Sequence, residues 1–112
     1  MTMPLVSLCE SENTLTPQEI DRAIAAQFNI GHAAYSRSSG AMLRLIAALK
    51  GRYWCEMKVN FDPDHLYPCR AGFTPVLTSG WNGVPDYSAQ ARTLPMAVAL
   101  AALAIGTIEA EE

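Results

Sequence analysis

The sequence has few charged side chains and few of the residue types that build common reactive sites. Charged residues make up 17% of the 112 residues, and the chain contains only two histidines and three cysteines. The cysteines, Cys9, Cys55 and Cys69, are odd in number and lack CxxC spacing, which excludes the usual zinc and disulfide frameworks. The amino terminus also lacks the basic start and long apolar run of a signal peptide. These absences favour a reducing cytoplasm.

Apolar residues, in contrast, make up half of the chain. This content excludes a disordered protein and is enough for one globular domain with its own core. The longest uncharged stretch has an apolar centre of about thirteen residues, fewer than the roughly 20 needed to cross a bilayer, so no membrane partner is expected. We expect a loose arm over residues 1–15, a single domain over 16–108 and an acidic tail over 109–112.

The net charge of −3 changes sign along the chain. A duplex nucleic-acid partner is not expected, because a duplex-binding protein must neutralise phosphates. Residues 30–92 nevertheless carry seven basic and four acidic side chains, a net of +3, between two acidic flanks. This segment favours a small anionic ligand, although short-range ion pairs would give the same distribution.

Two helices are predicted in the first half of the chain. The run Thr16-Pro17-Gln18-Glu19 has the pattern of a capping box with proline at the first helical position, and Gly31 is the expected end of that helix. The second helix is expected to begin at Ser36 or Ser38 and to end at Gly51.

A third helix closes the domain and is apolar on every side. Thr93 is its predicted cap, Pro95 lies in its first turn, and no side chain from Leu94 to Ile108 is charged. One face of a sheet cannot cover such a helix, so either it is central within the fold or it meets a second subunit. We expect a homo-oligomer through this helix. The acidic residues after it lie at the negative end of the helix dipole and should fray.

Strands are predicted between the second and third helices. They cover residues 53–61, 69–77 and 87–92, and a fourth short strand is expected near residues 5–8. Pro75 argues for an edge position or a strand end. Short hairpin connections imply an antiparallel sheet, so the chain belongs to the α+β class. The expected architecture is an αβα sandwich with the order helix, helix, three strands, helix.

Three segments resemble the phage ABA sandwich domain family. They are Tyr35-Ser36 before an apolar helix, the run Gly-Arg-Tyr-Trp at 51–54, and Ala-Gln-Ala-Arg-Thr-Leu-Pro-Met-Ala-Val at 89–98. The likeness covers residues 35–104 and implies a small bacteriophage protein of this fold, acting in an infected bacterium, with no established catalytic residues. The chain departs from the family pattern after Ser36, where Arg37-Ser38-Ser39 replaces an acidic residue.

A double-stranded RNA-binding domain has a similar order of elements. That module needs lysines at the start of its last helix to contact phosphates. The corresponding helix here begins Thr93-Leu94-Pro95-Met96, which argues against this interpretation.

Candidate ligand contacts combine cationic and aromatic side chains. Guanidinium groups bind phosphate, and flat rings stack on a base. Arg37 also lies near the amino end of a predicted helix, and Trp81 lies in a glycine-rich loop without a core position. Solvated arginines and core aromatic residues are the competing explanation. The candidates are Arg37, Arg44, Arg52, Arg70, Trp54, Trp81 and Tyr87.

Two sets of reactive residues suggest an enzyme instead. Asp62, Asp64, His65 and Cys69 have side chains that ligate metals, although turn chemistry around Pro63 explains the two aspartates as well. Cys55 is a possible nucleophile with His32 or His65 as its base, but it lies on the apolar side of its strand, where thiols are inert. No metal and no cofactor are therefore expected.

The preferred interpretation is a non-enzymatic, phage-derived binding protein in the cytoplasm of the host. Such a protein would antagonise host defence by sequestering an anionic signalling nucleotide or by occluding a defence protein. The alternatives are a small metal-dependent hydrolase that uses the loop from Asp62 to Cys69, and a virion or assembly accessory protein.

Overall fold

A computed structural model describes residues 6–60, 62, 64–76 and 87–111. These residues form three α-helices and a four-stranded sheet with the strand order β1-β4-β3-β2. Strands β2, β3 and β4 pair antiparallel, and β1 pairs parallel with β4. The elements are β1 (Val6–Cys9), α1 (Pro17–Phe28), α2 (Ser39–Leu49), β2 (Tyr53–Val59), β3 (Cys69–Pro75), β4 (Tyr87–Ala91) and α3 (Leu94–Glu111). The predicted α+β class, the order of elements and the fourth strand are confirmed.

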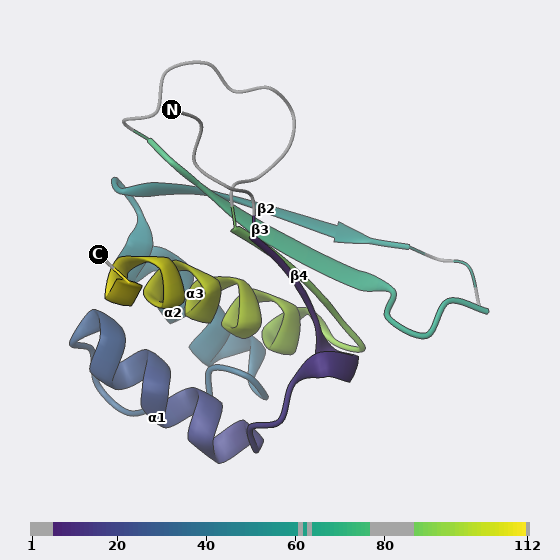
Figure 1. Cartoon of the computed structure of the whole chain (residues 1–112), viewed down its shortest axis with the longest axis horizontal. Coiled ribbons are helices and arrows are strands. Elements are labelled where there is room, and N and C mark those ends of the chain that lie inside the picture. Colours follow the sequence, from purple (N-terminus) through teal and green to yellow (C-terminus); the bar gives the residue numbers. More distant parts are fainter. Residues whose placement is uncertain (1–5, 61, 63, 77–86, 112) are drawn as a thin grey trace.

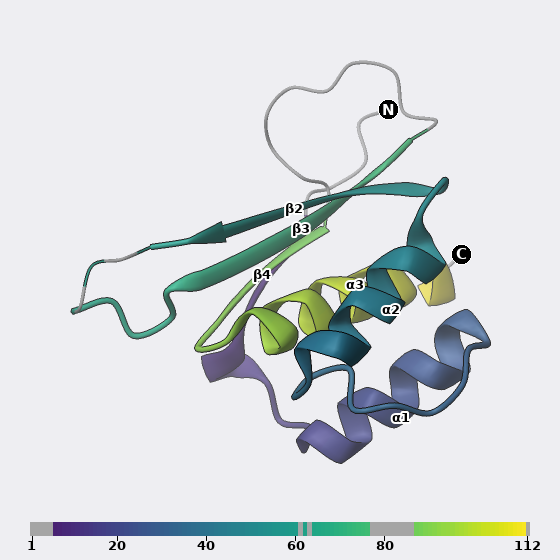
Figure 2. The same ribbon diagram turned by 180° about the vertical axis from the view of Figure 1, so that it is seen from behind.

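The three helices lie on one face of the sheet (Figures 1 and 2). Helix α3 contacts the sheet with one side and α1 and α2 with the other. The layers are therefore the sheet, then α3, then the pair α1 and α2, whereas an αβα order would place the sheet in the middle. This order follows from the sequence of α3, because a helix without a polar side can be covered from two directions.

Most described side chains of α3 are enclosed within one copy of the chain, and Leu94, Pro95 and Leu103 are partly buried. Seven of the enclosed side chains have no exposed surface: Ala97, Val98, Ala99, Ala101, Ala102, Ala104 and Ile105. Of the two alternatives, a central position in the fold is the one observed up to Ile105. Up to Ile105, the apolar character of α3 therefore requires no second subunit, and the oligomer contact expected on Leu94 to Ile108 stays a prediction. Among the described helices, none combines the length and apolar content that a bilayer crossing requires.

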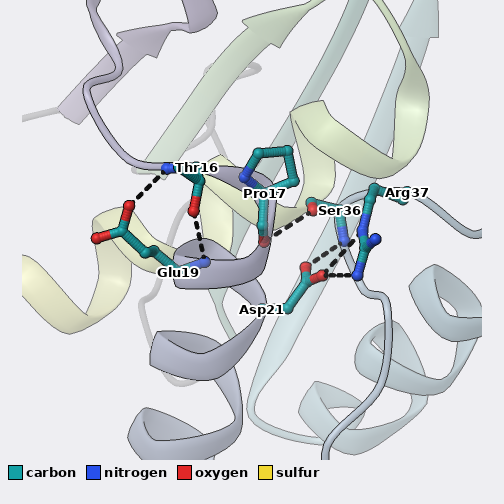
Figure 3. A network of polar contacts seen from close by, with 6 residues as sticks. All are labelled: Thr16, Pro17, Glu19, Asp21, Ser36 and Arg37. Atoms are coloured by element: carbon teal, nitrogen blue, oxygen red, sulfur yellow. Dashed lines mark hydrogen bonds and ion pairs between the residues drawn. The ribbon is translucent and has the colours of Figure 1, made fainter.

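Helix α1 begins as predicted and ends two residues earlier than expected. The Thr16 hydroxyl accepts the backbone N–H of Glu19, and the Glu19 carboxylate accepts that of Thr16, which completes the capping box (Figure 3). Asn29 follows the helix in the left-handed conformation, with φ of 53°, instead of Gly31. Asparagine tolerates this conformation better than most residues with a side chain.

Helix α2 uses the second of its two candidate caps. The Ser38 hydroxyl accepts the backbone N–H of Ala41. The backbone N–H of Ser36 instead donates to the carboxylate of Asp21 in α1. Gly51, with φ of 94°, lies just beyond the helix, as predicted for its end. Pro75 is the last residue of β3, which confirms the prediction of a strand end.

Candidate functional site

The face of the sheet that points away from the helices carries polar side chains. Side chains alternate between the two faces of a strand, and Ala71 and Phe73 of β3 belong to the buried core beneath. Arg70, Gly72 and Thr74 therefore lie on the opposite face. This face, with its neighbours on β2 and β4, is called the open face below.

One row of the open face brings two cations together. The register places Lys58 of β2 directly opposite Arg70 of β3, and Arg70 opposite Gln90 of β4. Like charges at directly opposite positions destabilise a sheet. Lys58 Nζ lies 2.8 Å from Glu56 Oε1, so its charge is offset within its own strand. The guanidinium of Arg70 has no ion pair with the described residues.

A hollow of about 290 Å³ adjoins this row. The residues before β3 form part of its wall because side chains shape the preceding turn: Asn60 Oδ1 accepts the Asp62 N–H at 2.9 Å, and Asp62 Oδ1 accepts the Asp64 N–H at 3.0 Å. The lining combines cationic, aromatic and amide groups. It consists of Lys58, Val59, Asn60, His65, Tyr67, Pro68, Arg70 and Gln90.

Trp54 lies on the same face but away from the hollow. Its position is opposite Thr74, and its side chain is 54% exposed. Trp54 and Arg70 are separated by four positions along the strands, roughly 13 Å at the usual rise per residue. Trp54 and Arg70 therefore lie on the same face of the sheet, but they are too far apart to contact the same small ligand.

The other predicted contact residues are dispersed. Arg44 is exposed on α2 and Arg52 is exposed in the turn after it. Tyr87 is a core residue that packs edge-on against Tyr53, with ring centroids 6.4 Å apart, so its prediction as a ligand contact is wrong. Trp81 lies outside the described residues.

Arg37 takes part in a structural ion pair. Its Nη2 lies 3.1 Å from Oδ2 of the buried Asp21, as Figure 3 shows. A hollow of about 530 Å³ nearby includes Arg37, Arg92 and the amino ends of α2 and α3. Glu10 Oε1 accepts the backbone N–H of Arg92 at 2.9 Å there and lies 3.9 Å from Nε of its guanidinium. Because carboxylates already compensate both arginines, an anion would have to displace them, and the hollow beside Arg70 is the better anion site.

Sequence reasoning did not single out Lys58, Tyr67 and Gln90, which line the hollow. The alternation of β2 placed Lys58 on the same side as Trp54, which was a usable signal. Its neighbours could not be identified without the register, which depends on the length and geometry of the turn between β2 and β3.

The residues proposed for an enzyme do not converge. The two aspartates accept backbone hydrogen bonds or stand exposed in the turn, and the Cys69 thiol lies 3.7 Å from the Arg92 carbonyl on the core side. Within the described ranges, no three histidine, cysteine or acidic side chains gather at one point. Burial, with a smaller effect of Glu56, raises the pKa of Cys55 to about 11, so this thiol is protonated near neutral pH.

Comparison with protein-family models and with curated proteins gives no match. Among solved structures, the chain is similar to a phage protein from Bacillus cereus ATCC 14579. The two share 17% sequence identity with a TM-score of 0.59, over 83% of this chain and 89% of that one. At this identity the likeness shows a common fold. The phage ABA sandwich domain family itself is not shown.

Proposed function

We propose that this chain is a bacteriophage binding protein that holds a nucleotide in the hollow beside the Lys58–Arg70–Gln90 row. The observation that carries the proposal is the guanidinium of Arg70, which lines that hollow and has no ion pair with the described residues. A phosphate would give Arg70 the anionic partner that the described residues do not provide.

The remaining lining suits the other parts of a nucleotide. Tyr67 offers a ring on which a base can stack, and the amides of Asn60 and Gln90 can both donate and accept hydrogen bonds with the edge of the base. The volume of about 290 Å³ lies at the lower end of small-molecule pockets, which start at about 300 Å³. This size favours a single nucleotide over a longer ligand.

The likeness in fold to a phage protein supports a role during infection. We infer that the protein acts in the host cytoplasm by removing a nucleotide that signals to a defence system. Binding without turnover agrees with this lining, because its described residues include no serine, cysteine or carboxylate side chain. Its histidine, His65, already accepts the backbone N–H of Tyr67 at Nδ1, 3.3 Å away.

Calorimetric titration with AMP, ADP and ATP tests the proposal. We expect saturable binding, weakened about tenfold or more by Arg70→Ala, because a charge-assisted hydrogen bond contributes about 1.5–3 kcal/mol. Arg22→Ala is the matched control, since Arg22 is an exposed arginine on α1, remote from the sheet. Absence of saturation by all three nucleotides, or equal losses in the two variants, would overturn the proposal.

Tyr67→Ala separates recognition of the base from recognition of phosphate. This variant should weaken nucleotide binding and leave the affinity for inorganic phosphate unchanged, because the ring contacts only the base. Equal weakening of both ligands would show that Tyr67 acts through the shape of the turn.

A further inference from the structure

Strand β2 forms an edge of the sheet without a strand beside it. It is the last strand in the order β1-β4-β3-β2, and no described residue pairs with its outer side. Proteins usually protect such an edge with short length, charged side chains, a proline or a bulge. Strand β2 has seven residues, no proline and an unbroken register with β3, and its two charged residues, Glu56 and Lys58, are of opposite sign. It can therefore pair with another strand whose charges are complementary.

The hydrogen-bond pattern identifies the backbone groups that face outward. Asn60 donates to the Pro68 carbonyl at 2.7 Å and Val76 donates to the Arg52 carbonyl at 2.9 Å, so even-numbered residues of this segment bond to β3. Bonding residues alternate in an antiparallel pair. The N–H and C=O groups of Cys55, Met57 and Val59 consequently point away from the sheet.

The side chains at this edge are partly apolar and uncovered. Met57 and Val59 are 42% and 40% exposed, although they lie on the same side of β2 as Tyr53, which is partly buried against the core. The expected apolar side of this strand is therefore buried only in its first half. Figures 1 and 2 show the reason, since the hairpin of β2 and β3 extends beyond the helices.

We propose that β2 pairs antiparallel with β2 of a second copy of this chain, about a two-fold axis at Met57. Each sheet has four strands, so the pair forms one continuous eight-stranded sheet. In this register Met57 faces Met57 of the second copy, and Cys55 faces Val59. The outward backbone groups of these residues then bond across the axis, and their side chains cover one another.

Charge selects this register. With the axis at Met57, Glu56 stands opposite Lys58 of the second copy, and Lys58 opposite Glu56. An axis at Glu56 or at Lys58 instead places two identical charges opposite each other. The Glu56–Lys58 pairs also occupy the positions where backbones do not bond and side chains approach most closely. Within one copy these two groups already lie 2.8 Å apart, on the same face of β2.

Helix α2 lies on the same side of the molecule as β2, and Figure 2 shows both on the near side. The buried stripe of α2 packs inward, and its opposite stripe exposes Leu43, Arg44, Ala47 and Ala48, with Leu43 57% exposed.

Charge reversal tests the register by sedimentation equilibrium. We expect the natural chain to dimerise, and Glu56→Lys or Lys58→Glu alone to raise the dissociation constant about tenfold, because each places two like-charged pairs across the axis. Mixing the two single variants should restore association as a heterodimer, since both cross-axis pairs are then complementary. The double variant should associate like the natural chain.

Three results would overturn the proposal: a monomeric natural chain, single variants that associate like it, or a mixture that associates no better than its components. Far-ultraviolet circular dichroism shows whether each variant is folded. Met57→Pro is the independent variant, because it removes only an outward N–H and should yield a folded monomer. The test needs no nucleotide, so its outcome is separate from that of the proposed binding function.

Discussion

The carboxylate of Asp21 joins α1 to the segment that leads into α2. Its Oδ1 accepts the backbone N–H of Ser36 at 2.8 Å, and its Oδ2 lies 3.1 Å from Nη2 of Arg37. The Ser36 hydroxyl in turn donates to the Pro17 carbonyl at 3.4 Å, so contacts run in both directions (Figure 3). Asp21 is buried, and it therefore needs these partners to offset its lost hydration.

Removal of this carboxylate should destabilise the domain. Asp21→Ala leaves the buried Ser36 N–H without an acceptor, and we expect a loss of about 2–4 kcal/mol in the free energy of unfolding. Asp21→Asn keeps an oxygen for that N–H and loses only the charge, so its effect should be smaller. Urea denaturation measures both. Equal losses would show that the ion pair with Arg37, and not the backbone contact, provides the stabilisation.

The alanines of α3 allow close packing on two sides. Ala101 has no exposed surface between the sheet and the outer helices. Ala101→Leu inserts a larger side chain into a filled space and should cost about 1–3 kcal/mol of stability. Ala26→Leu on the exposed side of α1 is the matched control and should have little effect. Similar urea midpoints for both variants would contradict the central position of α3.

Local signals in the sequence predicted the elements, and contacts between distant segments decided the rest. The capping box at Thr16 and the cap at Thr93 act within one turn of helix, so the sequence alone reveals them. The pairing of Arg37 with Asp21 joins residues 16 positions apart, and the row from Lys58 through Arg70 to Gln90 joins three strands. Neither the ion pair nor the row produces a pattern among neighbouring residues in the sequence. For this reason the sequence predicts a ligand contact for Arg37 and does not single out Lys58.

The order of the layers could not be predicted from the sequence either, because it also depends on contacts between distant segments. The sequence pattern of an apolar helix is the same whether its second side contacts another subunit or contacts α1 and α2 of its own chain. The free edge of β2 was equally invisible, because alternation predicts which residues share a face and leaves open which strand lies next to them.

Thr74 carries a buried hydroxyl that has no partner among the described residues, so its replacement should stabilise the protein. The residue is 5% exposed, and its Oγ1 has no hydrogen bond with the described residues. Thr74→Val keeps the shape and removes the unsatisfied group, and we expect a gain of about 1 kcal/mol. Thermal unfolding of this variant, beside Thr14→Val at an exposed position, measures the effect. A lower melting temperature for Thr74→Val would reveal a hydrogen bond to this hydroxyl.

The thiol of Cys55 should make stability fall in alkaline solution. Burial raises its pKa from 9.0 to about 11 in the folded chain, so the folded state retains a proton that the unfolded state loses. The contribution is therefore fully present below pH 9 and is lost as the pH rises toward about 11. Burial raises the pKa of Cys69 in the same direction.

Urea unfolding across this alkaline range, compared with Cys55→Ala, tests the prediction. The variant has a lower starting stability because it loses buried sulfur, so the comparison concerns the slope of the unfolding free energy against pH. The slope should be shallower in Cys55→Ala, and Cys69 accounts for part of the decline that persists. Identical slopes in the two proteins would mean that the Cys55 thiol ionises as readily in the folded chain as in the unfolded one.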